Sequence, residues 1–186
     1  MDFRNSTDLD DARLYAMFLR HTAPYRHNRL TVRVRPSRGA DFSGTCYYRN
    51  ARIHVNLGRH NRYPYALATN IAKAQTTRNG WRRELYQLTL TDGYQLALFV
   101  YLHELFHYLV KLAHRSPRRK EAMCDRFATR VLVDDYGCRV QRRSGQPVRR
   151  ELWDFKDLDA FVAAAPKERQ MRLPLCGEIP VRIVGA

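Results

Sequence analysis

The chain has 186 residues, with 33 Lys+Arg against 18 Asp+Glu, a formal net charge of +15 and an apolar fraction of 45%. This length suits one domain with a substantial core, and the apolar fraction excludes wholesale disorder, which requires low hydrophobicity together with high charge. The longest apolar run, Leu96 to Leu102, is too short to cross a bilayer and no secretory leader is visible, so we expect neither a membrane span nor Sec-dependent export.

The four cysteines are dispersed, and no CxxC pair is present. This pattern is unlike that of a disulfide scaffold, so we expect reduced thiols in a cytoplasmic protein. The positive charge fits nucleic acid, an acidic protein partner or simply an arginine-rich surface. Charge alone therefore does not decide the function.

The first half of the chain predicts one helix and three strands. Residues 8–21 have apolar side chains at helical spacing, with Thr7 as the expected N-cap. Residues 30–35 alternate between apolar and polar, as a half-buried strand does. Residues 44–48 and 52–57 are separated by a turn signal, which predicts a hairpin.

The middle of the chain predicts two long helices. Between them and the hairpin we expect a short helix at 66–74 and an alternating segment at 84–90. Leucines at spacings of three and four mark a helix over 92–113. Ser116-Pro117 is a favoured N-cap and N1 pair and predicts a second helix that runs to Tyr136, where Gly137 ends it.

The C-terminal part predicts less regular structure. Residues 139–150 are polar and basic, as expected of a loop. A short packing helix is expected next, and residues 166–186 are expected to be a tail. The apolar positions of the packing helix are Trp153, Phe155, Leu158, Phe161 and Val162. The whole pattern indicates an α+β fold in residues 1–165, in which a small three-stranded, approximately antiparallel sheet packs against the two long helices.

The motif with the clearest chemistry is His103-Glu104-Leu-Phe-His107 within the first long helix. Side chains four residues apart lie one above the other on a helix, so His103 and His107 can bind one metal ion from a single face. Glu104 lies beside them, where a carboxylate can accept a proton from metal-bound water. We therefore predict one Zn²⁺ ion, with Glu104 as the general base.

Zinc requires a third protein ligand. His114 lies about 10 Å further along the helix axis than His107, too far for one tetrahedral ion. Glu121 and Asp125, four residues apart on the next helix, fit better: Glu121 as the third ligand and Asp125 as the acceptor for the second ring nitrogen of His103. Cys124 is a competing soft donor, which we expect to pack in the core.

These parts predict a mechanism for peptide hydrolysis. A metal-activated water attacks the peptide carbonyl after Glu104 accepts its proton. The strand containing Ile53, Val55 and Leu57 is either an edge strand that pairs with an extended substrate or an ordinary core strand. Candidate donors to the developing oxyanion are Tyr108, His114 and Tyr136.

At His103-Glu-Leu-Phe-His107 and Glu121-Ala-Met-Cys-Asp125 the chain resembles the gluzincin metallopeptidases. The resemblance is closest to the compact ImmA/IrrE-type zinc peptidases, weak over 52–57 and good over 96–133. It implies a minimal zincin-like domain in which His103, His107 and Glu121 bind zinc and Glu104 is the general base. The SprT-like peptidases take a third histidine instead, and no histidine follows His114.

Basic residues crowd the start of the second long helix, at Arg115, Arg118, Arg119 and Lys120. A second cluster follows at 142–150. We interpret these clusters as a solvated surface, or as a patch that binds nucleic acid or an acidic protein or peptide substrate. The leading hypothesis is a cytoplasmic zinc endopeptidase. The alternative is a nucleic-acid-binding protein whose zinc site is structural or vestigial.

Overall fold

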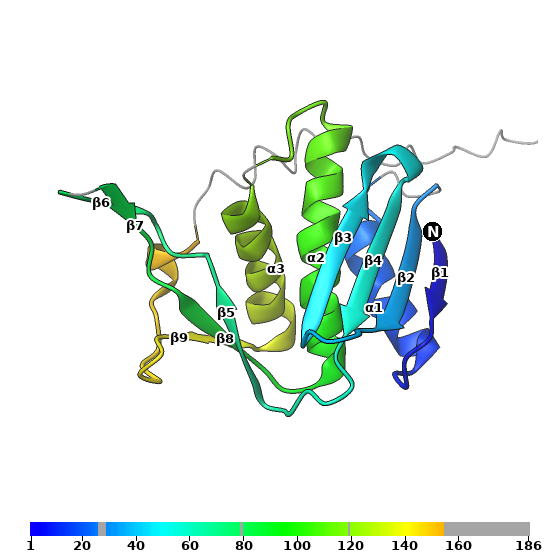
Figure 1. Ribbon diagram of the computed structural model, residues 1–186, viewed down its shortest axis with the longest axis horizontal. Helices are drawn as coiled ribbons and strands as arrows, with labels where there is room; N and C mark the ends of the chain where they lie inside the picture. Colours follow the sequence, from blue (N-terminus) through cyan, green and yellow to red (C-terminus); the bar gives the residue numbers. More distant parts are fainter. Residues whose placement is uncertain (26–28, 79, 119, 155–186) are drawn as a thin grey trace, which may run out of the picture.

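The computed structural model of the protein describes residues 1–25, 29–78, 80–118 and 120–154 (Figure 1). The helices are α1 (Asp11–Thr22), α2 (Gly93–Leu112) and α3 (Glu121–Tyr136), with short 3-10 segments η1 (Tyr48–Asn50) and η2 (Arg150–Leu152). The strands are β1 (Asp2–Asn5), β2 (Thr31–Pro36), β3 (Phe42–Tyr47), β4 (Arg52–Leu57), β5 (Tyr65–Thr69), β6 (Gln75–Thr77), β7 (Gly80–Arg82), β8 (Tyr86–Leu90) and β9 (Arg139–Gln141). The α+β class is confirmed.

The main sheet has four strands in the order β1-β2-β4-β3. β1 pairs with β2, and β2 with β4, in parallel, whereas β3 runs antiparallel to β4. The predicted three-stranded antiparallel sheet is therefore wrong. The sequence does not reveal β1, which is only four residues long, and α1 is the crossover that returns the chain parallel to it.

The hairpin of β3 and β4 is confirmed, but β4 is an interior strand with β2 on one side and β3 on the other. A second sheet has the order β5-β8-β9, and β6 pairs with β7. The helix expected at 66–74 is wrong, because β5 occupies 65–69. Leu67 and Thr69 are buried there while Ala66 and Ala68 are exposed, which is the period of a strand. The loop expected at 139–150 begins with β9.

All three predicted long segments, α1, α2 and α3, are helices, and the starts of α1 and α3 differ from the expectation. α1 begins at Asp11, because the side chain of Asp10, and not that of Thr7, accepts the Arg13 N–H at 2.7 Å. α2 begins after Asp92 as expected, and the Asp92 carboxylate accepts the Gln95 N–H at 2.9 Å. α3 begins only at Glu121, so Ser116 and Pro117 lie in the connection.

The end of each long helix explains that connection. α2 stops at Leu112, and His114 adopts a left-handed conformation with φ of 57° that no helix can continue through. α3 ends at Gly137 with φ of 66°, and the Cys138 N–H donates to the Leu132 carbonyl at 3.0 Å. The predicted glycine stop is therefore confirmed.

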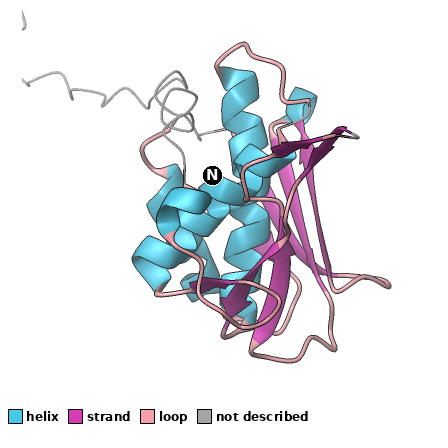
Figure 2. Cartoon of the chain, turned by 90° about the vertical axis from the view of Figure 1, so that its left-hand side faces the viewer, coloured by secondary structure: helices cyan, strands magenta, loops and turns pink. Residues whose placement is uncertain are grey.

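α2 forms the centre of the molecule, between the main sheet and α3 (Figures 1 and 2). Its leucines Leu98, Leu102, Leu105 and Leu109 are buried, as the periodicity predicts. Phe18 of α1 stacks on Tyr101 with ring centroids 4.1 Å apart. Because α2 is covered on most sides, polar side chains on it need partners within the protein.

The described residues end at 154, so they include only the beginning of the expected packing helix and none of the expected tail. Trp153 is buried in the core, but the rest of the packing helix and the tail at 166–186 lie outside the described residues. Among the residues that the structure describes, no helix combines the length and apolarity that a bilayer crossing needs.

Candidate metal centre

The predicted ligand residues meet in the space between α2 and α3. Nε2 of His103 lies 3.1 Å from Oε2 of Glu121, and Nε2 of His107 lies 3.3 Å from Oε1 of the same carboxylate. Donors at about 2.0–2.1 Å from one tetrahedral ion are about 3.3–3.5 Å apart, so this spacing suits a shared metal. The close placement of the three residues is as expected, and metal binding stays a prediction.

Asp125 orients His103 from behind. Oδ1 of Asp125 accepts the His103 Nδ1–H at 2.8 Å, and its other oxygen accepts the Asn70 N–H at 2.8 Å. The Asp125 side chain is 10% exposed and is hydrogen-bonded through both oxygens. It therefore fixes the ring so that Nε2 faces Glu121, which is the arrangement expected of a histidine ligand.

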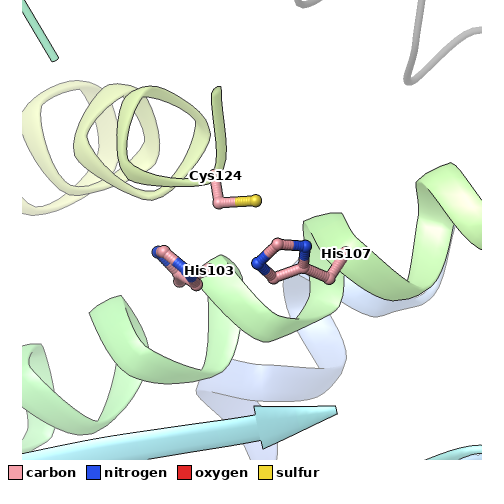
Figure 3. A group of neighbouring side chains, drawn as sticks. All are labelled: His103, His107 and Cys124. Atoms are coloured by element: carbon pink, nitrogen blue, oxygen red, sulfur yellow. The ribbon is translucent and has the colours of Figure 1, made fainter. Parts of the chain in front are cut away.

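Cys124 lies closer to the two histidines than expected. It packs in the core against Phe106 and Val110 as predicted, yet the donor atoms of His103, His107 and Cys124 all lie within 4.8 Å of one another (Figure 3). Residues three apart on a helix are neighbours, so Cys124 shares the inner face of α3 with Glu121. The cluster therefore offers His/His/Glu and His/His/Cys donor sets.

Glu104 occupies a buried position between α2 and the edge strand β3. The residue is only 9% exposed, and a Cβ added to Gly44 would lie 2.7 Å from its Cγ. Burial raises the pKa of Glu104 to about 7, although the nearby His103 lowers it and the Cys46 N–H donates to the carboxylate. A carboxyl group of this pKa can both accept and return a proton near neutral pH.

His103, His107 and Glu121 shift one another's pKa values through hydrogen bonds and charge. Burial lowers the pKa of His103, but hydrogen bonds to Asp125 and Glu121 outweigh burial and raise that pKa to about 10. Burial and the adjacent His103 lower the pKa of His107. The hydrogen bond from His103 lowers the pKa of Glu121, whose side chain is 64% exposed. Glu121 is thus an ionised acceptor at the open side of the cluster.

A groove of about 970 Å³ opens beside the cluster and contains Glu104, His107 and Glu121. Its other walls contain four Lys and Arg side chains among both polar and apolar surface: Thr45, Cys46, Tyr48, Arg49, Lys111, His114, Arg115, Ser116, Pro117 and Arg118. Of the predicted basic patch, Arg115 and Arg118 line the groove, and Arg119 lies outside the described residues. On the other side of Glu104 a smaller hollow of about 230 Å³ has one apolar wall, which includes Phe42, Leu67 and Phe99. Its other wall is polar and consists of Asn70, His103, Glu104 and Asp125.

The candidate oxyanion donors separate in the structure. His114 lines the groove, whereas Tyr108 is buried and Tyr136 lies at the end of α3, with its hydroxyl 3.1 Å from His21. Tyr48, which the sequence analysis missed, lines the groove instead. Burial, Cys46 and Glu104 raise its pKa to about 12, so it remains a hydroxyl donor at neutral pH. Its position directly after β3 was the signal that could have identified it.

Of the two alternatives for Ile53, Val55 and Leu57, the ordinary core strand is confirmed and the substrate-binding edge strand is wrong. These residues belong to β4, which is hydrogen-bonded on both sides, and all three are buried. The edge strand of the main sheet next to Glu104 is β3. Alternating apolar residues identify a strand, but they cannot show which neighbour closes a sheet.

Comparisons with known proteins give no further assignment. No protein-family model, curated protein or solved structure matches the chain.

Proposed function

We propose that the protein is a cytoplasmic zinc-dependent endopeptidase with a gluzincin-type site on a minimal zincin-like domain. The supporting observation is the Glu121 carboxylate, whose two oxygens lie 3.1 and 3.3 Å from Nε2 of His103 and His107, with the Glu104 carboxylate in the same groove. His103, His107 and Glu121 fit zinc by donor type and spacing. A bound zinc ion supplies a water of lowered pKa and polarises the substrate carbonyl.

Glu104 has the position and the pKa for proton transfer. As an ionised carboxylate it accepts a proton from the attacking water, and it then donates that proton to the departing amine. The Cys46 N–H orients the carboxylate. Tyr48 or His114 donates a hydrogen bond to the developing oxyanion from the wall of the groove.

The edge strand β3 is the element to which an extended peptide would bind. Its outer backbone edge is unpaired among the described strands, so Phe42–Tyr47 offers main-chain hydrogen bonds to a substrate. The apolar wall of the hollow beside Glu104 accepts one apolar side chain, and Arg49, Lys111, Arg115 and Arg118 favour acidic residues in the groove. The preferred substrate is therefore an acidic peptide with an apolar residue near the cleaved bond.

Metal content and cleavage of an acidic peptide library test the proposal. The wild type should hold about one equivalent of zinc, and Glu121→Ala should lose it. Glu151→Ala removes an exposed carboxylate outside the cluster and should retain the zinc. Glu104→Gln should bind zinc and cleave nothing. Cleavage by Glu104→Gln, or unchanged zinc in Glu121→Ala, would contradict the assignment.

Two observations favour a second candidate function, a nucleic-acid-binding protein with a structural zinc: Cys124 lies beside the histidines, and the net charge is +15. If Cys124 binds together with both histidines and Glu121, four protein donors close the site, and no position remains for water. Cobalt substitution distinguishes the two, because a thiolate ligand gives a sulfur-to-cobalt charge-transfer band that Cys124→Ser abolishes. A strong band in an inactive protein favours the structural site, and its absence favours the peptidase.

A further inference from the structure

The metal centre lies toward the C-terminal end of α2, at one end of the main sheet. A second, polar hollow lies at the opposite end of that sheet. The strands β1, β2 and β4 are parallel, so their carboxyl ends meet at one edge of the sheet, the lower edge in Figure 1. A hollow of about 870 Å³ opens there, next to Ser6, Ser37 and Arg59, which follow these three strands. The carboxyl ends of parallel strands are a common place for a ligand site.

The lining of this hollow is cationic. Arg35, Arg38 and Arg59 line it together with serine side chains, and no acidic residue of the described part is among the lining residues. Within the described residues these three arginines also have no carboxylate partner. Other arginines of the protein do, for example Arg33 with Asp2 at 3.3 Å and Arg130 with Asp154. Arg35, Arg38 and Arg59 are therefore not held in ion pairs within the described residues, and the nearest acidic lining residue, Asp8, belongs to the adjoining hollow.

Two of the three lining serine hydroxyls, those of Ser37 and Ser43, can donate to a ligand, whereas the Ser6 hydroxyl donates to the Val34 carbonyl at 3.2 Å. Ser37 Oγ accepts the Ala40 N–H at 3.3 Å, and Ser43 Oγ accepts an N–H of Asn56 at 2.9 Å. A hydroxyl that accepts one hydrogen bond still has its own proton to donate. The side-chain carbonyl of Asn56 accepts the Arg35 Nε–H at 3.1 Å, which fixes the base of the guanidinium and leaves its two outer nitrogens for a ligand.

We propose that this hollow is a binding site for a phosphate group. Guanidinium groups bind phosphate oxygens in a bidentate manner, and hydroxyl donors complete the set of hydrogen bonds. The volume exceeds one phosphate ion and suits a phosphorylated small molecule or a segment of nucleic-acid backbone. The site uses no residue of the metal centre, so it does not depend on the proposed peptidase activity.

The test uses the full-length protein and four probes: inorganic phosphate, adenosine monophosphate, adenosine and a labelled single-stranded DNA 20-mer. The site variant is Arg35→Gln/Arg38→Gln/Arg59→Gln. The matched control, Lys73→Gln/Arg78→Gln/Arg82→Gln, removes three exposed charges near the β6–β7 hairpin. Titration calorimetry and fluorescence anisotropy give the affinities, and circular dichroism checks the fold.

We expect at least one phosphate-bearing probe to bind saturably and adenosine not to bind. The site variant should lower that affinity tenfold or more, and the control should change it less than twofold. If adenosine monophosphate binds, the source is a small phosphorylated molecule, and if only DNA binds, it is a phosphodiester backbone. If the site variant does not fold, Ser37→Ala/Ser43→Ala replaces it in the test. This double variant keeps the charge and should lower affinity several-fold. Equal losses in site and control variants, or no saturable binding, would overturn the proposal.

Discussion

Gly44 of β3 provides the sharpest test of the site geometry. A Cβ built at Gly44 meets Oε1 of Glu104 and lies 2.7 Å from its Cγ and 2.9 Å from its Cδ. Carbon atoms pack at about 3.5–4.0 Å, so Gly44→Ala must displace the Glu104 carboxyl group by about 1 Å. The clash is with the end of a side chain, so the carboxyl group moves while the backbone of β3 stays in place.

This displacement has two consequences of known size. A misplacement of about 1 Å at a catalytic group costs about 100-fold in rate, so Gly44→Ala should lower peptide cleavage by that factor. Overpacking costs about 1–3 kcal/mol of stability, partly offset by the gain of about 0.5–1 kcal/mol when alanine replaces glycine in a strand. Zinc affinity should change little, because the three atoms nearest to the added Cβ all belong to Glu104, which is not one of the proposed ligands.

The double variant with Glu104→Ala separates these effects without an activity assay. In that background the carboxyl group is absent, so Gly44→Ala should be neutral or stabilising in urea denaturation. In the wild-type background it should be destabilising, and the difference between the two is the coupling energy of the pair. Equal effects in both backgrounds would show that Gly44 and Glu104 do not touch, and the geometry of the site would be wrong.

Three further predictions follow from single contacts. Asp125→Asn weakens the orientation of His103 and should lower zinc affinity about 10–100-fold, measured by competition with a chromophoric chelator, while Asp11→Asn should not. Burial lowers the pKa of His21 from 6.5, so the unfolded chain takes up a proton at a higher pH than the folded protein. Stability should therefore fall as the pH drops below 6.5. The urea midpoint of His21→Gln should fall less between pH 7.5 and 5.5 than that of the wild type. Phe18→Ala removes a buried ring stacked on Tyr101 and should cost about 3–5 kcal/mol in urea denaturation, and an unchanged midpoint would contradict the packing of α1.

Local patterns predicted the elements that are long or chemically marked. The leucine spacing of α2, the turn between β3 and β4 and the glycine that ends α3 each depend on neighbours along the chain. The placement of His103 and His107 on one face also follows from helix geometry alone. The sequence could therefore bring the two histidines together and suggest Glu121.

Features that depend on distant segments were missed. No local signal shows that β1 joins the sheet or that β3 closes it, because strand order is decided by contacts far apart in sequence. Cys124 was named as a competing donor but expected to pack in the core, yet position i+3 from Glu121 also brings it to the histidines. The hollow at Arg35, Arg38 and Arg59 requires three parallel strands to end together, which composition cannot show.

The contact between Asp125 and Asn70 links the metal centre to the end of β5. The same helix holds this segment a second time, since Arg126 Nε donates to the Ile71 carbonyl at 3.1 Å. The amide proton of Asn70 is therefore protected only while the Asp125 carboxylate stays in place. The rate of hydrogen exchange at the Asn70 amide therefore reports on the metal centre. Exchange is slow while Asp125 holds His103 in place and becomes faster when the centre opens, and the measurement needs no substrate.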